Sequence, residues 1–208
     1  DDQGRYSFKN QPHIGLWNLG CLAQALTPLI PAEQCNDALA QYETVYLEEY
    51  AALMRAKLGL ATAVDADREL IVDLFGIMAE AGVDYTNFFR KLGDFKTTAP
   101  GGNSPLRDLF IRREAFDAWA QRYRARLAQE NSVDAQRRQC MNRVNPKYVL
   151  RNYLAQVAIQ QAGEHKDYSE IDRLLTLLQH PFDEQPQMEA YAAPAPDWAS
   201  GIHVSCSS

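Results

Sequence analysis

Four cysteines carry the most reactive side chains in this sequence of 208 residues: Cys21, Cys35, Cys140 and Cys206. No two of them are spaced as CxxC, the pair typical of zinc sites and dithiol redox centres. So few cysteines are typical of a reducing compartment. The apolar neighbours of Cys21 and Cys35 predict buried thiols, whereas Cys140 lies among arginines, which predicts a thiol more acidic than usual.

Cys206 lies two residues before the end of the sequence, within IHVSCSS. A chain end gives a thiol access to other thiols. His203, when protonated, would offset the effect of the terminal carboxylate and favour the thiolate. Cys206 is therefore the redox candidate. The alternative is a cysteine that stays reduced and has no role, and the residues alone leave both interpretations open.

The other reactive side chains form no arrangement that binds a metal or a nucleotide. His13, His165, His180 and His203 make no HExxH or close Cys/His pair, so we expect them at the surface or at helix caps. The loop PGGNSP lacks the lysine that ends a Walker phosphate loop. The sequence GDFK has Lys96 where the DFG turn of kinases has glycine. We therefore predict no catalytic, cofactor-binding or metal-binding residue in this chain.

Composition indicates an ordinary globular protein, with 46% hydrophobic and 23% charged residues. A net charge of −6 argues against nucleic-acid binding, because phosphates attract basic surfaces. No apolar run reaches the roughly 18 residues of a membrane span, and DDQGRYSFKN lacks the apolar core of a signal peptide. We expect a soluble, cytoplasmic protein without a membrane partner. Because the sequence begins without methionine, we interpret it as a processed product or a fragment.

Charge is distributed unevenly along the chain. Residues 107–151 contain eleven basic and five acidic side chains, and the densest cluster is Arg137, Arg138 and Arg143. One interpretation is a set of solvated helix faces. The other is a surface that docks an acidic partner, either another protein or another part of a longer chain.

Apolar residues recur at three- and four-residue steps over most of the sequence, which predicts a mostly α-helical bundle. We expect a first helix over residues 14–29 and a second over 32–59, which Gly59 ends because glycine suits the left-handed C-terminal position. A third helix should start at a cap at Asp65 or Asp67 and end at Gly82, and a short one should cover 85–92. Residues 93–105 predict a loop because prolines and glycines break the helical period. Later helices are expected around 116–127, from Pro146 with Asn145 as the cap, and from a Ser169 cap. The residues expected to face the core are Leu16, Leu19, Leu22, Ala23 and Leu26; Leu39, Tyr42, Val45, Tyr46, Tyr50, Leu53 and Met54; Leu70, Ile71, Leu74, Phe75 and Met78; Phe116, Trp119, Tyr123 and Leu127; Val149, Leu150, Tyr153, Leu154 and Val157; and Ile171, Leu174, Leu175 and Leu178.

Three stretches resemble the selenoprotein O family: GRYSFKNQPHIGLWNLGCLAQAL, NPKYVLRNYLAQVAI and the terminal CSS. The resemblance covers nearly the whole chain and points to a bacterial member with Cys206 in place of selenocysteine. It implies a kinase-like protein that transfers AMP from ATP, with Mg or Mn, onto Ser, Thr or Tyr hydroxyls of protein substrates. In the family's pattern the nucleotide-binding and catalytic residues lie upstream of GRYSF, so none is carried over to a position here.

The resemblance also implies an organisation. Residues 1–95 would correspond to the end of the activation segment and the kinase-like large lobe, and residues 96–105 to a loop. Residues 106–180 would form the C-terminal helical part of the same domain, and 181–208 an extended tail. Trp17 would be a core anchor, and Cys206 would pair with an activation-segment cysteine upstream of residue 1.

Two functional hypotheses follow from the sequence. In the first, the chain is the C-terminal helical part of a protein adenylyltransferase, inactive alone, whose partners are the upstream kinase-like part and the protein substrates. In the second, it is an autonomous helical interaction module with a basic docking face at Arg137, Arg138 and Arg143. A partial lobe would expose apolar surface, so we also expect the isolated chain to self-associate.

Overall fold

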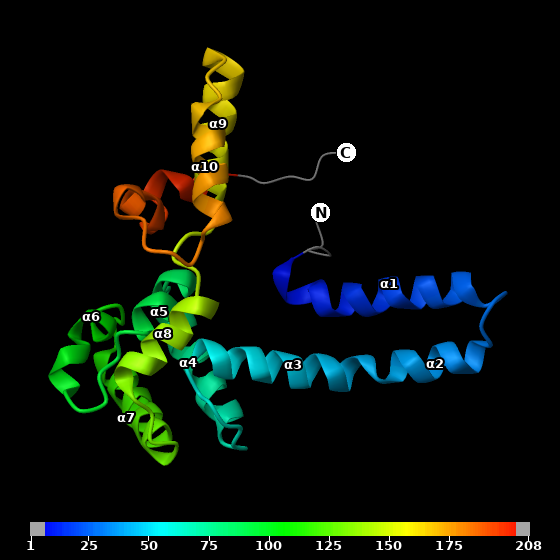
Figure 1. Ribbon diagram of the computed structural model, residues 1–208, viewed down its shortest axis with the longest axis horizontal. Helices are drawn as coiled ribbons and strands as arrows, with labels where there is room; N and C mark the ends of the chain where they lie inside the picture. The colour runs from blue at the N-terminus through cyan, green and yellow to red at the C-terminus, as the bar shows by residue number, and fades with distance from the viewer. Residues whose placement is uncertain (1–6, 203–208) are drawn as a thin grey trace. The chain divides into compact units, whose positions relative to one another are not determined.

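A computed structural model describes residues 7–202, and every regular element within them is helical (Figure 1), which confirms the mostly α fold class. The α-helices are α1 (Gln11–Leu26), α2 (Ala32–Ala40), α3 (Tyr42–Lys57), α4 (Asp67–Ala81), α5 (Tyr85–Leu92), α6 (Ser104–Arg107), α7 (Arg113–Gln129), α8 (Asp134–Val144), α9 (Asn152–Gln160) and α10 (Ser169–Gln179). Short 3₁₀ helices are η1 (Phe8–Asn10), η2 (Pro100–Asn103), η4 (Pro186–Ala192) and η5 (Asp197–Gly201), and η3 (Gln161–His165) is a π-helical turn.

The described residues divide into two compact units, residues 7–53 and Met54–Ile202, with the boundary inside α3. Within residues 7–202, no helix combines the length and the apolar character that crossing a membrane requires.

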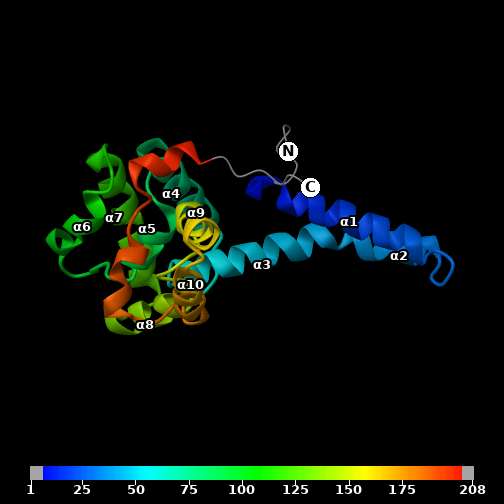
Figure 2. The ribbon, with the colours of Figure 1, turned by 90° about the horizontal axis from the view of Figure 1, so that it is seen from above.

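The first unit is a helical hairpin in which α1 runs antiparallel to α2 and the start of α3 (Figures 1 and 2). Pro12 suits the first turn of α1, where a missing N–H costs no hydrogen bond. Tyr42 closes the hairpin because its hydroxyl donates to the carbonyl oxygen of Pro12 at 2.9 Å. A side chain at Gly15 would come within 2.9 Å of the Tyr42 hydroxyl oxygen, so glycine permits this close approach.

The expected buried face of α1 is wrong for this chain. No residue of α1 is fully buried, and Leu22 exposes 54% of its surface. Trp17, expected as a core anchor, exposes 55%. The physical reason is that two helices share only one interface. Burying a side chain completely requires further elements to cover it, and within residues 7–53 the hairpin has none.

The single helix expected over residues 32–59 is two helices, interrupted at Gln41. Its side chains are less buried than the periodicity indicates, because Val45, Tyr50 and Leu53 are all exposed. Met54 is buried in the core of the second unit, as expected.

Gly59 ends this segment with a φ of +68°, which confirms the predicted left-handed glycine. A Cβ atom there would lie 2.5 Å from Cγ of Arg137 and 2.8 Å from Sδ of Met141. Both the backbone conformation and the packing therefore require glycine at this position. Gly82 closes α4, also as predicted, with a φ of +61°, but no atom lies within 4 Å of its virtual Cβ.

The core of the second unit is aromatic and is built mainly on α4, α5 and α7. Trp119 and Tyr123 of α7 stack with ring centroids 4.9 Å apart, and both are buried as the sequence predicts. Their polar atoms bond to backbone carbonyls: Trp119 Nε1 donates to Leu70 at 2.9 Å, and the Tyr123 hydroxyl donates to Leu58 at 2.6 Å. Burial raises the pKa of the Tyr123 hydroxyl, so it stays a donor. These bonds fix how α7 lies on α4 and on the turn that follows α3.

Asp67 is the first residue of α4 rather than its cap. One of its carboxylate oxygens accepts the Val64 amide at 3.0 Å, and the other accepts Nε of Arg126 at 2.6 Å. Glu130 accepts a second bond from Arg126, at 3.0 Å, and also caps the backbone amides of Ala61 and residue 62. A buried cation thus holds two carboxylates and the turn before α4 together.

The helix expected from Pro146, with Asn145 as its cap, is present as α9, but it begins at Asn152, so the predicted start and cap are wrong. An unpredicted helix, α8, ends at the predicted start instead, with Asn145 as its C-cap. The Asn145 side chain is fully buried, donating to the Lys57 carbonyl oxygen at 2.9 Å and accepting from Lys57 Nζ at 3.0 Å. α8 was missed because its polar sequence has little apolar periodicity. The role of Asn145 was misjudged because its partner, Lys57, lies 88 positions away in the sequence.

α9 and α10 form a small second cluster around Leu154, Ala158 and Leu174. Two details of the expectation for α10 are wrong: Ile171 and Leu175 are exposed, and its N-cap is the residue before Ser169. α10 packs against α9 through Leu174, and Ile171 and Leu175 lie outside this contact.

Residues 181–202, after α10, pack against these helices and include η4 and η5, so this part of the tail is not wholly extended. The Tyr191 hydroxyl donates to Glu170 at 2.8 Å, and Trp198 meets Tyr153 edge-on at 5.9 Å.

Candidate functional site

The structure separates the three arginines that the sequence offered as a docking cluster. Arg137 is buried, with only 1% of its side chain exposed. Its guanidinium donates to the carbonyl oxygen of Phe95 and pairs with Asp134 at 3.0 Å. Asp134 also accepts two bonds from Thr97, and these, with Arg137, outweigh its burial and hold the pKa of Asp134 below its ordinary value. Arg137 therefore fixes the loop before α6 and cannot present its charge to a partner.

Arg138 and Arg143 do lie on the surface of α8. Arg138 forms an exposed ion pair with Asp94 at 3.0 Å. Arg143 is exposed and makes no ion pair within residues 7–202. Cys140 is exposed on the same helix, beside the buried Arg137. Cys35 is buried as predicted, but the prediction for Cys21 is wrong, because this thiol is exposed on α1.

The basic excess of residues 107–151 is largely matched inside the fold. Nine of its eleven cations form ion pairs, several of them with acids outside the segment, such as Glu80, Asp73, Asp67 and Asp84. The acidic remainder of the chain thus supplies the counter-charges. A segment that is basic in sequence is not a free basic surface in three dimensions.

A polar interface joins α9, α10 and the tail to the aromatic core. Glu184 in the tail accepts from Lys147 and from Arg90, both at 2.6 Å, and these bonds lower its pKa. Arg151 reaches Asp84, the cap of α5, at 2.6 Å. Burial opposes ionisation of Asp84, but the bonds from Arg151 and the Asn87 amide outweigh it, so its pKa is also lowered. Both carboxylates are therefore ionised at neutral pH.

Cys206, the redox candidate, and His203 lie outside the described residues. The histidines within them, at 13, 165 and 180, are exposed, as the sequence predicts. In the same part of the chain, no group of three or more His, Cys, Asp or Glu side chains lies close enough to hold a metal ion.

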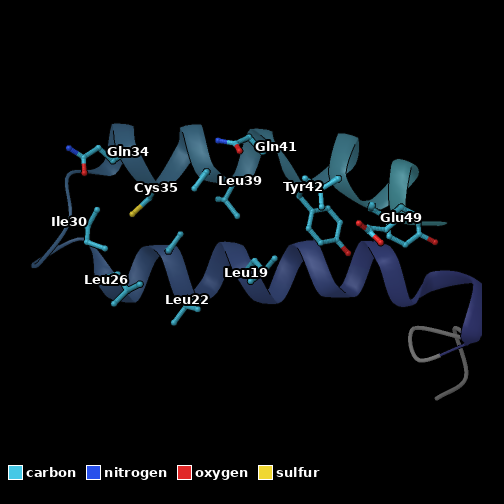
Figure 3. Close-up of a pocket in the computed structure, with 14 residues that line it drawn as sticks. Leu19, Leu22, Leu26, Ile30, Gln34, Cys35, Leu39, Gln41, Tyr42 and Glu49 are labelled. Carbon is cyan, nitrogen blue, oxygen red and sulfur yellow. The ribbon is translucent and has the colours of Figure 1, made fainter. Parts of the chain in front are cut away.

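The largest hollow described lies in the first unit, between α1 on one side and α2 and α3 on the other (Figure 3). Its volume is about 580 Å³. Its lining is mainly apolar: Leu19, Leu22, Ala23, Leu26, Ile30, Gln34, Cys35, Ala38, Leu39, Gln41, Tyr42, Val45, Tyr46 and Glu49. In Figure 3, Cys35 and Tyr42 point from the upper helices toward α1. We call this hollow the hairpin groove.

Sequence periodicity placed most of the groove's residues on helix faces but predicted a filled core there. Three tyrosines of α3 line up along one side: Tyr42 stacks on Tyr46 at 6.2 Å, and Tyr46 on Tyr50 at 6.1 Å. Burial and then the neighbouring Tyr46 raise the pKa of Tyr50. Tyr42 and Tyr46 of this stack line the groove, so one wall is aromatic, whereas the wall on α1 is aliphatic.

The family model described as "Protein adenylyltransferase SelO" matches residues 1–179, which include α1 to α10. The chain belongs to the SelO family. It is 56% identical over its whole length to the "Protein nucleotidyltransferase YdiU" of Myxococcus xanthus, 52% to that of Thiobacillus denitrificans and 50% to that of Pectobacterium atrosepticum. In each case the chain spans 42% of the length of the relative.

The SelO match confirms the family that the motifs GRYSFKNQPHIGLWNLGCLAQAL and NPKYVLRNYLAQVAI suggest. The first motif builds α1 and the groove. The second, residues 145–159, begins at the C-cap of α8 and includes Lys147 and Arg151 of the polar interface and most of α9. Both motifs therefore shape helix contacts within the chain.

Proposed function

We propose that this chain is the C-terminal helical part of a protein adenylyltransferase, an enzyme that transfers AMP from ATP to Ser, Thr or Tyr hydroxyls of proteins. The observation that carries the proposal is the SelO match, supported by relatives about 50–56% identical that are more than twice as long. In this proposal the helices correspond to the large lobe of a kinase-like fold and its C-terminal extension. The nucleotide and its Mg or Mn ion bind in the part of the polypeptide that this chain does not span, and the whole protein acts in the cytoplasm.

The role proposed for the chain itself is structural. The aromatic core and the buried Arg126 and Arg137 networks hold rigid helices, and a rigid scaffold is what positions catalytic loops supplied from elsewhere. Adenylyl transfer needs a precisely held nucleotide, because a group-transfer reaction depends on the alignment of the attacking hydroxyl. Protein substrates would meet the enzyme partly on these helices.

The experiment compares the 208-residue chain with the full-length protein. Each is incubated with ATP, Mg²⁺ or Mn²⁺ and a protein acceptor, and AMP addition to the acceptor is read by intact mass. We expect transfer by the full-length protein and none by the chain alone. Robust transfer by the chain alone would contradict the division of roles, and no transfer by the full-length protein would contradict the activity.

We also propose a redox role for Cys206, supported by the family resemblance of the terminal CSS. Formation of a disulfide with another thiol of the full-length protein releases two protons and two electrons to an oxidant such as oxidised glutathione. The measurement is peptide mapping of the oxidised full-length protein. We expect a disulfide-linked peptide that contains Cys206. Recovery of Cys206 only as a free thiol under oxidising conditions would contradict the role.

A further inference from the structure

The hairpin groove is an apolar surface that residues 7–53 line but do not cover. Leu19 and Leu22 line it from α1 and expose 40% and 54% of their surfaces, and Val45 lines it from α3 and exposes 53%. An exposed apolar groove in a soluble protein often marks a binding site. A two-helix hairpin also gains little stability from one interface. The groove therefore calls for an additional packing partner.

The shape of the groove suits a helix. One wall is α1 and the other is α2 followed end to end by the start of α3, and the two walls run side by side (Figures 1 and 3). A third helix laid between two antiparallel helices buries one apolar stripe against both, which is a common mode of helix-in-groove recognition.

The acidic side chains of residues 7–53 indicate what charge the helix in the groove should have. Residues 7–53 contain five carboxylates, Glu33, Asp37, Glu43, Glu48 and Glu49, and one lysine, Lys9. Within residues 7–202 none of these carboxylates forms an ion pair, and Glu49 lines the groove itself. A second copy of the chain would bring the same acidic surface and like charges would repel, whereas a basic segment would be attracted.

We propose that the hairpin groove holds an amphipathic helix with basic flanks, supplied by the part of the full-length polypeptide that this chain does not span. Relatives are more than twice as long as the chain, so such a segment is available in the same molecule at high effective concentration. The inference rests on the proposal that the chain is one part of a longer adenylyltransferase. It adds the surface through which the two parts are joined.

Two leucines provide a matched pair of probes. Leu22 lines the groove and Leu47 of α3 does not, yet each exposes 54% of its surface. Leu22→Cys and Leu47→Cys are made separately, both with Cys21→Ser to remove the neighbouring thiol. The rate of alkylation by N-ethylmaleimide at each introduced thiol is then followed by peptide mass spectrometry, in the full-length protein and in the 208-residue chain.

We expect the Leu22→Cys thiol to react at least about tenfold more slowly in the full-length protein than in the chain, because packing against a helix blocks the reagent until local opening occurs. The Leu47→Cys thiol should react at similar rates in both. Protection at Leu22→Cys should weaken as NaCl rises from 0.05 to 1 M, because salt screens the attraction between the acidic unit and a basic segment.

Several outcomes would overturn the inference. Equal rates at Leu22→Cys in both proteins would mean that the groove is open in the full-length molecule. Protection in the chain alone that grows with its concentration would identify a second copy as the occupant. Protection of both thiols alike would show that the protection is not specific to the groove, and salt-independent protection would exclude the basic helix. Because alkylation needs no ATP, failure of AMP transfer would contradict the proposed function and leave this inference standing.

Discussion

Arg126→Met should destabilise the second unit far more than Arg122→Met, although the two arginines lie one helical turn apart on α7. Arg126 exposes 6% of its side chain, and its two partners Asp67 and Glu130 expose 3% and 6%. Arg122 exposes 45%, and its partners Asp73 and Glu69 expose 43% and 73%. The comparison holds helix, residue type and substitution constant and changes only the burial of the ion pairs.

The magnitudes follow from what each substitution leaves behind. Without Arg126, two buried carboxylates lose their shared cation, and removing one partner of a buried ion pair costs about 3–5 kcal/mol. The bond from Arg126 Nη2 to the Thr62 carbonyl oxygen, at 2.7 Å, is also lost. Without Arg122, water solvates the freed carboxylates, so the cost is about 0–1 kcal/mol. We expect a difference of roughly 3 kcal/mol or more in the free energy of unfolding.

The assay is urea denaturation of the 208-residue chain and both variants, followed by far-ultraviolet circular dichroism and by tryptophan fluorescence. Coincident transitions with an unchanged dependence on urea establish that the free energies are comparable. If Arg126→Met costs less than about 1 kcal/mol, or no more than Arg122→Met, the buried network does not stabilise the fold and the reasoning is refuted. If Arg126→Met prevents folding altogether, Arg126→Lys, which keeps the charge but loses the planar bonds, provides an intermediate measurement.

Three further predictions test particular contacts. Gly59→Ala should lower the free energy of unfolding, measured by urea denaturation, by about 2–4 kcal/mol, because the new Cβ clashes with Arg137 and Met141 and the φ is unfavourable. Gly82→Ala has the same unfavourable φ but meets no neighbour, so it should cost only about 1–2 kcal/mol. Equal costs would contradict the packing argument. Asn145→Ala should cost about 1–3 kcal/mol in the same assay, because the Lys57 carbonyl oxygen loses a buried donor, and a cost near zero would contradict this. Glu184→Gln should speed amide hydrogen exchange in η4 at pH 7. The bonds from Lys147 and Arg90 lower the folded-state pKa of Glu184, so its stabilisation is present above the ordinary value of 4.5 and is lost as the pH falls through the lowered value. The exchange rates of wild type and variant should therefore converge in acid. A difference in rate that persists in acid would contradict the role of these ion pairs.

Some helix ends and helix stripes could be read from the sequence. Gly59 takes the predicted left-handed conformation, Gly82 ends α4 as predicted, and the helix expected over residues 85–92 has those bounds. The Phe116 to Leu127 stripe is buried as predicted. These features depend on residues within one or two turns of each other, so a local pattern contains most of the information.

The missed helix α8 shows the limit of that approach. Its sequence DAQRRQCMNRV is too polar for an apolar period, and only Arg137 and Met141 are buried. Arg137 is buried because it bonds to Phe95, 42 residues earlier in the chain, and a charge on a helix gives no sign of such a partner. For this reason the three arginines do not form the exposed cluster that the sequence predicted: Arg137 is buried, and only Arg138 and Arg143 are exposed.

What the sequence by itself determined is the family, the helical class and the places where helices stop, because motifs and left-handed glycines are local properties of the chain. Tertiary structure alone decided which charges are buried and which apolar faces stay open. Arg126 and Arg137 turned inward and Leu22 remained exposed, since burial depends on elements distant in sequence and on how many layers cover a helix.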